Sequence, residues 1–221
     1  MAYILNIETA TTNCSVSLSK EGEILVLKED NNLNYSHAES LHVFIDEVLK
    51  SAEITLNQLR AIAVSKGPGS YTGLRIGVSA AKGLCFALGI PLISVETLHS
   101  LSRQLNIGEG FIVPMLDARR MEVYSAIFDK NYNQIRATEA QILDETSFIG
   151  YLNEQRLYFI GNGVEKAKTI IQHENAIFVD NQLPSSREMG ILTFDKYTKN
   201  DIEDVAYFEP YYLKEFIGTV S

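Results

Sequence analysis

The helices and strands that the sequence predicts occur in the same order twice, and this repetition constrains the fold more than any single motif. In each half, apolar runs predict three strands followed by a helix, a strand, a helix, a strand and a last helix. The second copy has shorter elements. The expected ranges are 3–10, 14–19, 23–28, 36–52, 61–65, 72–88, 92–95 and 97–104 in the first half, and 111–117, 122–129, 134–139, 144–153, 157–160, 164–172, 176–179 and 185–197 in the second.

Two successive copies of the order β-β-β-α-β-α-β-α indicate an α/β protein with the duplicated ribonuclease-H-like, or actin-like (ASKHA), fold. Each copy then forms a mixed sheet with helices on both faces. The 221 residues are enough for two domains with cores of their own. We therefore expect an N-terminal lobe over 1–105 and a smaller C-terminal lobe over 106–221, whose tail, from about 204 to 221, packs back onto the first lobe.

The charge of the chain limits what it can bind on its own. The formal net charge is −9 and the pI is about 5.0, whereas a protein that binds phosphate backbones alone carries clustered Lys and Arg. Nucleic acid is therefore expected to bind only with the help of a partner. Arg75, Arg119 and Arg120 are the candidate contacts, although salt bridges within the protein are the commoner role of such residues.

The cysteines and the N-terminus indicate the compartment. Cys14 and Cys85 are the only cysteines, too few for a disulfide framework or a thiolate metal site. Residues 1–8 have no basic segment and therefore do not resemble a signal peptide. The apolar run 76–95 contains Lys82 and Pro91, which argue against a membrane span. We expect a reduced, cytoplasmic protein with no membrane segment.

A glycine-rich turn, 67–73, separates the strand 61–65 from the helix 72–88. Such a turn leaves backbone N–H groups at a helix N-terminus, which suits an anion, but the spacing matches neither the dinucleotide fingerprint nor the Walker A loop. The helix also carries glycines in its interior, and each costs about 1 kcal/mol relative to alanine. Something must therefore approach its backbone closely: either the protein's own sheet or a neighbouring helix, or another subunit.

The helix 36–52 is amphipathic, and Ser36 with Glu39 forms a capping-box pattern at its start. Together with the small-residue side of the helix 72–88, its apolar stripe predicts a surface for docking another subunit. The expected interface residues are Leu41, Phe44, Ile45, Val48, Gly73, Leu74, Gly77, Ala80, Ala81 and Leu84.

The sequence contains four distinctive strings: IETAT from Ile7, GPGSYTGLRIG from Gly67, DAR from Asp117 and EVY from Glu122. With weaker matches at GNG from Gly161 and EPYYLK from Glu209, they resemble the bacterial TsaB (YeaZ) family, the glycoprotease-like, M22-peptidase-like proteins of the actin-like ATPase superfamily. The resemblance implies a non-catalytic scaffold subunit that pairs with the catalytic paralogue TsaD and is joined by the ATPase TsaE. That complex attaches threonylcarbamoyl to N6 of adenosine 37 in tRNAs reading ANN codons. It also implies that tRNA is contacted only through the complex, and that the chain forms a homodimer when alone.

The resemblance further implies that the metal of the catalytic paralogue is absent. Aligned from Pro91, the two histidines of the paralogue's H-x-x-x-H motif fall on Thr97 and Leu101. A leucine cannot ligate a metal, and one hydroxyl does not replace two imidazoles. His99 lies between these positions, where a lone histidine is more often a helix-surface residue. We expect no catalytic residue, no metal and no cofactor, and a metallo-peptidase is the least favoured alternative.

A stand-alone actin-like ATPase or kinase is the other alternative. Proteins of that fold hold phosphates and Mg²⁺ with two hairpins that contain an acid and glycines. Here the hairpin with Glu8 and Thr9, and the one with Asp117, contain no glycine that lets the backbone close on a phosphate. Gly161 and Gly163 follow a strand and either cradle an adenosine or begin a helix. These five residues are expected to form, at most, a vestigial nucleotide cleft.

Overall fold

The computed structural model describes residues 1–31 and 37–214. The chain divides into two compact units. Unit 1 comprises Met1–Glu96 together with the chain from Ser185 onward, and unit 2 comprises Thr97–Pro184. The predicted order of elements is confirmed in both halves, but the expected lobes 1–105 and 106–221 differ from these units.

Unit 1 contains a mixed five-stranded sheet in the order β3-β2-β1-β4-β5. Strand β1 is antiparallel to β2 and parallel to β4, and β4 is parallel to β5. The strands are β1 (Tyr3–Glu8), β2 (Cys14–Lys20), β3 (Glu23–Asp30), β4 (Leu59–Gly67) and β5 (Leu92–Glu96).

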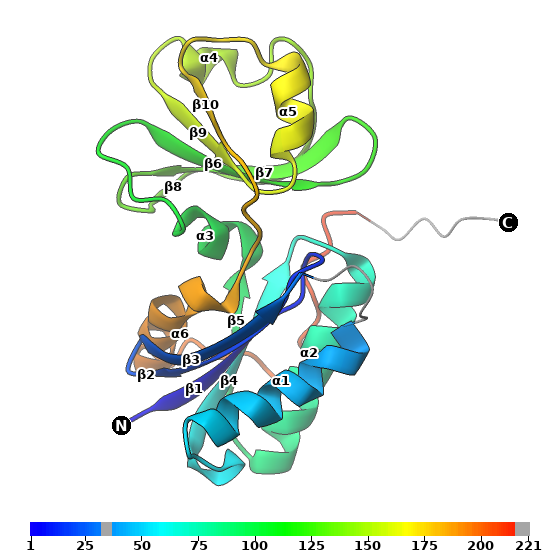
Figure 1. The fold of residues 1–221 in the computed structure, drawn as a ribbon, viewed down its shortest axis with the longest axis vertical. Coiled ribbons are helices and arrows are strands. Elements are labelled where there is room, and N and C mark those ends of the chain that lie inside the picture. The colour runs from blue at the N-terminus through cyan, green and yellow to red at the C-terminus, as the bar shows by residue number, and fades with distance from the viewer. Residues whose placement is uncertain (32–36, 215–221) are drawn as a thin grey trace, which may run out of the picture. The chain divides into compact units, whose positions relative to one another are not determined.

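Helices cover both faces of this sheet (Figure 1). One face packs against α1 (His37–Ser51) and α2 (Tyr71–Leu88), and a short 3-10 helix, η1 (Leu56–Gln58), precedes β4. The other face packs against α6 (Met189–Thr198), next to the 3-10 helix η2 (Ser186–Glu188). Successive side chains of a strand point to opposite faces, so Ile4 of β1 belongs to the α6 core and Leu5 to the α1–α2 core.

Unit 2 repeats this design with a sheet in the order β10-β9-β6-β7-β8. Its strands are β6 (Phe111–Asp117), β7 (Glu122–Asp129), β8 (Gln134–Ile142), β9 (Leu157–Ile160) and β10 (Ala176–Val179). One core includes residues of α4 (Ile149–Leu152) and α5 (Val164–Ile170), and α3 (Thr97–Ser102) packs into the other. Each unit is thus a mixed sheet with helices on both faces, and the pair is the duplicated ribonuclease-H-like fold that the sequence predicts.

The last helix of each half belongs to the other unit, which explains why the two units differ from the predicted lobes 1–105 and 106–221. Helix α3 follows β5 along the chain but packs on β6 and β7, whereas α6 follows β10 but packs on β1 and β5. Sequence patterns locate a helix along the chain, but the sheet that a helix covers is set by contacts between residues far apart in sequence.

Helix α4 is much shorter than the predicted range 144–153. Asp144 starts a local turn instead, because its Oδ1 accepts hydrogen bonds from the backbone and the hydroxyl of Thr146 (2.9 and 2.7 Å). The backbone N–H of Asp144 also donates to Ser147 Oγ (2.9 Å). Such side-chain bonds compete with helix formation, so the helix begins only after Phe148, which has a positive φ of 64°.

The segment 203–212, here called the C-terminal strap, lies on unit 1. Glu203 donates its backbone N–H to Leu92 O (2.8 Å) at the edge of the sheet, and Tyr211 donates to Lys66 O (2.7 Å). Val205 and Phe208 pack against the α1–α2 core. Described as far as Lys214, the tail therefore lies on the first lobe as expected, and 215–221 lie outside the described residues. In the described part of the chain, no helix has the length and apolar character needed to cross a membrane.

Candidate functional site

The glycine-rich turn packs against the turn between β1 and β2. Ser70 donates its backbone N–H to Ala10 O (2.7 Å), and a Cβ atom on Gly69 would lie 2.5 Å from the same oxygen. Ser70 Oγ also caps α2 by accepting from Gly73 N (3.3 Å). The backbone of the β1–β2 turn therefore lies directly against the glycine-rich turn.

Two glycines of α2 accommodate Thr9 in the same way. A Cβ atom on Gly73 would collide with the carbonyl oxygen of Thr9, and one on Gly77 would collide with Thr9 Oγ1. That hydroxyl donates to Gly73 O (2.8 Å). The close approach that these glycines predict is thus packing against the protein's own sheet, one of the two explanations left open by the sequence.

Most of the residues predicted for the docking interface are buried within unit 1. An amphipathic stripe marks the face of a helix that covers its own sheet, so such residues are unavailable to a partner. The buried ones are Leu41, Ile45, Val48, Gly73, Leu74, Gly77 and Ala81. Phe44, Ala80 and Leu84 are half-buried and remain at the surface. Ser36, the predicted cap of α1, lies outside the described residues.

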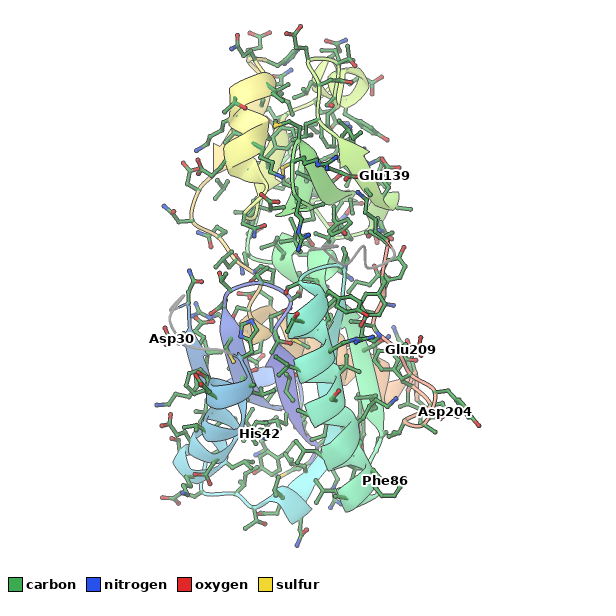
Figure 2. The ribbon with its side chains drawn as sticks, turned by 90° about the vertical axis from the view of Figure 1, so that its right-hand side faces the viewer. Asp30, His42, Phe86, Glu139, Asp204 and Glu209 are labelled. Atoms are coloured by element: carbon green, nitrogen blue, oxygen red, sulfur yellow. The ribbon has the colours of Figure 1, made fainter. Side chains whose placement is uncertain are left out.

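The outer sides of the same two helices carry a different set of apolar residues. Phe86 is 84% exposed and Val43 is 52% exposed, and a Cβ atom on Gly83 would meet no atom of the described chain within 4 Å. Figure 2 shows α1 and α2 side by side. It labels His42, which precedes Val43 in α1, and Phe86 near the end of α2. We call Val43, Gly83 and Phe86, together with Phe44, Ala80 and Leu84, the outer α1–α2 face.

Glu8, at the end of β1, is fully buried. Desolvation raises the pKa of its carboxyl to about 7, opposed by hydrogen bonds from the Ala10 and Thr9 backbone and the Ser65 side chain. Its Oε1 accepts from Ala10 N (2.6 Å), and its Oε2 has no hydrogen-bond partner within the described residues. Glu8 thus holds the β1–β2 turn together, and its carboxyl keeps its proton to a higher pH than an ordinary carboxyl does.

Asp117 and the two glycines of the predicted cleft lie together in unit 2. Asp117 Oδ1 accepts from Lys166 Nζ (2.9 Å) and Arg119 N (2.7 Å), and its backbone N–H donates to Asn162 Oδ1 (2.9 Å). A Cβ atom on Gly161 would collide with the Met115 carbonyl oxygen. One on Gly163 would lie 3.0 Å from a methyl group of Val123. The glycines therefore let α5 begin close against β6 and β7, which favours the helix-start alternative over an adenosine cradle.

The three arginines proposed as nucleic-acid contacts are all exposed. The guanidinium of Arg75 lies 4.3 Å from the centre of the Tyr71 ring, a cation–π contact. Arg119 and Arg120 form the tight turn between β6 and β7, both with positive φ (69° and 47°). Their side chains are thus available at the surface of unit 2.

The positions that correspond to the paralogue's metal-binding histidines do not suit a metal ion. Thr97 and Leu101 are both fully buried on α3, and a leucine has no lone pair to offer. The described residues contain no group of three or more His, Cys, Asp or Glu that could hold a metal ion.

Comparisons with known proteins identify relatives over nearly the whole chain. The family model TsaD, tRNA N6-adenosine threonylcarbamoyltransferase, matches residues 32–215. The tRNA threonylcarbamoyladenosine biosynthesis protein TsaB of Haemophilus influenzae is 28% identical, over 96% of this chain and 93% of its own length. TsaB of Escherichia coli is 27% identical, over 97% and 96%. Among solved structures, YeaZ from Pseudomonas aeruginosa superposes with a TM-score of 0.82 at 26% identity, covering 96% of this chain and all of the other.

Proposed function

The chain belongs to the tRNA N6-adenosine threonylcarbamoyltransferase family, among its TsaB, or YeaZ, members, and from this premise we propose that it is a non-catalytic subunit that binds and activates a TsaD-type paralogue. Its role lies in tRNA threonylcarbamoyladenosine biosynthesis, as in its named relatives. The paralogue transfers threonylcarbamoyl to N6 of adenosine 37 in tRNAs reading ANN codons, and this chain supplies the surface on which the active complex assembles.

The observation that carries this proposal is Gly83. A glycine in a helix interior costs about 1 kcal/mol relative to alanine, and no described atom of the chain comes close enough to need it. A backbone from outside, packed closely on α2, accounts for a residue without a side chain at this point. The exposed apolar side chains of Phe86 and Val43 beside it also lose contact with water when a partner covers them.

The proposal that the chain itself is inactive is supported by its chemistry. Thr97 and Leu101 cannot hold the metal that the paralogue's histidines hold. Thr9 and Ala10, which belong to a phosphate-binding turn in actin-like ATPases, are bonded to Gly73 and Ser70 of this chain. The stand-alone ATPase and the metallo-peptidase are therefore less favoured than the scaffold.

We further propose that the outer α1–α2 face pairs with itself when the paralogue is absent. Because the two proteins share a fold, the same pair of helices is expected on both, and two copies pair about a two-fold axis. Such a homodimer covers the docking face and competes with the heterodimer. The ATPase TsaE and the tRNA then join the heterodimer rather than the isolated chain, in keeping with the net charge of −9.

Sedimentation velocity of the chain, alone and mixed with the catalytic paralogue of the same organism, tests this assembly. A homodimer that converts to a heterodimer is expected, and Gly83→Arg should abolish both species. Gly150→Arg is the matched control, because Gly150 also lies in a helix with open space around its Cβ position. The variant Gly77→Arg is unsuitable, since its side chain would collide with Thr9 and disturb the fold. Unchanged assembly of Gly83→Arg would overturn the assignment of the face.

A further inference from the structure

The C-terminal strap is fastened to α2 by one lysine. Lys82 Nζ donates to Phe208 O (2.8 Å) and to Ala206 O (3.2 Å). Asp204 shapes the preceding turn, because its Oδ1 accepts from Ala206 N (2.8 Å) and Tyr207 N (3.3 Å). The backbone on both sides of Tyr207 is therefore fixed, while its side chain is 84% exposed.

The bonds of Lys82 hold the backbone around Tyr207 on the side of α2 that carries Phe86. Phe86 lies four residues after Lys82, one turn further along the same side of α2. Two strongly exposed aromatic side chains thus flank one lysine, one on the helix and one on the strap. Figure 2 shows the strap, with Asp204 and Glu209 labelled, running beside α2 on the side where Phe86 lies.

The strap is acidic. Between Glu203 and Tyr212 the sequence has three acids and neither Lys nor Arg, and the side chains of Asp204 and Glu209 are exposed. Two cations lie beside this segment: Lys82 is bonded to backbone oxygens, and the exposed Arg75 interacts electrostatically with Glu209. A protein that covers Phe86 and Tyr207 therefore meets negative charge at the edge of the contact.

We infer that the C-terminal strap forms the second half of the docking surface, with Phe86 and Tyr207 as its apolar centre and Asp204 and Glu209 as its acidic rim. The occupant is the heterologous partner, through a surface that presents basic side chains around an apolar recess. This inference rests on the proposed function and adds to it how the chain chooses between its partner and itself.

The choice follows from the charges. In a two-fold homodimer both copies contribute the same patch, so the acidic rim of one strap adds to that of the other. Like charges brought together at an interface weaken association, whereas complementary charges strengthen it and speed encounter. The strap thus opposes self-pairing and favours a partner that carries basic groups.

The affinity of the chain for the catalytic paralogue, measured by isothermal titration calorimetry, tests the inference. Tyr207→Ser should weaken binding at least tenfold, and Glu209→Lys should weaken binding to the paralogue while strengthening the homodimer. Ile142→Ser is the control, because Ile142 is 70% exposed on β8 of unit 2, and its affinity should equal that of the unmodified chain. Raising the salt concentration should weaken the heterodimer and strengthen the homodimer. Salt screens both the attraction between the strap and a basic partner and the repulsion between two straps.

The outcomes separate the two proposals. If Gly83→Arg blocks binding while Tyr207→Ser and Glu209→Lys bind normally, the strap has no part in docking, and the inference is overturned while the proposed function stands. If the unmodified chain fails to bind the paralogue, the proposed function itself is overturned. Thermal melting of each variant confirms that the fold is intact, as the exposed positions predict.

Discussion

Thr9 Oγ1 lies 2.8 Å from the carbonyl oxygen of Gly73, to which it donates a hydrogen bond, and the missing side chain of Gly77 makes room for it one turn along α2. The β1–β2 turn is thereby bonded to the helix that follows the glycine-rich turn. The two segments contact each other at Gly73 and Gly77, whereas Gly83 has no such neighbour, so the glycines of α2 have two different roles.

The two roles predict opposite effects of alanine. Gly77→Ala should lower the free energy of unfolding by about 1–3 kcal/mol, because the methyl group collides with Thr9. Gly83→Ala should raise it by up to about 1 kcal/mol, because the methyl group meets open space and alanine favours the helix. Urea unfolding of both variants measures the difference. Equal changes in the free energy of unfolding of the two variants would contradict the assignment of different roles to Gly77 and Gly83.

The buried Glu8 predicts a pH-dependent stability. Its pKa is about 7 in the folded protein, against 4.5 for the ordinary carboxyl, so the folded state holds the proton more tightly than the unfolded one. The stabilisation is therefore complete below about pH 4.5 and is lost as the pH rises to 7, a decline of about 3 kcal/mol. In Glu8→Gln this decline should disappear. Urea unfolding at a series of pH values checks it, and an unchanged slope would show that Glu8 titrates normally.

Removing the hydrogen bonds from Lys82 to the C-terminal strap should loosen the strap and leave the rest of unit 1 folded. Lys82→Met retains an apolar stem but loses both bonds to the strap carbonyls, at an expected cost of about 1–2 kcal/mol. Limited proteolysis should then cut the chain near Tyr207 earlier than in the unmodified protein. Lys50→Met is the control, because Lys50 pairs with Asp46 on the exposed side of α1, away from the strap. Equal cleavage in both variants would show that Lys82 does not hold the strap.

The isolated chain should bind no ATP·Mg²⁺ at physiological concentrations. The turn with Thr9 and Ala10 is filled by α2 and the glycine-rich turn, and neither hairpin offers a glycine for a phosphate. Isothermal titration of the chain with ATP and Mg²⁺ measures this. Micromolar binding that is lost in Thr9→Ala would restore the stand-alone ATPase as the leading function.

The fold could largely be predicted from the sequence, because each half buries regular apolar patterns in strands and helices. The strands at Phe111–Asp117, Glu122–Asp129, Leu157–Ile160 and Ala176–Val179 begin and end where the sequence predicts. The exchange of α3 and α6 could not be predicted, since it depends on which sheet a helix meets. The prediction of a helix over 144–153 is wrong because Asp144 bonds locally to Thr146. Apolar spacing does not reveal that such a side-chain bond competes with helix formation.

The proposed docking surface is only partly visible in the sequence. The sequence predicts it on α1 and α2, through an apolar stripe that the structure places against the protein's own core. In the sequence, Gly83 stands out as a glycine that costs helix stability. Together with the apolar Phe86, it indicates the outer side of α2. The sequence alone could not separate Gly83 from Gly77, because the difference lies in whether Thr9 is nearby.

The central claim is that this chain activates a catalytic paralogue by binding it, and the formation of threonylcarbamoyladenosine on tRNA tests it most directly. The reaction would be reconstituted from the purified paralogue, TsaE, tRNA and threonylcarbamoyl-adenylate, with the chain added in increasing amounts. We expect modification to rise with added chain and to level off at one chain per paralogue, with Gly150→Arg equally active and Gly83→Arg inactive. Full modification without the chain, or equal activity of Gly83→Arg, would contradict the account.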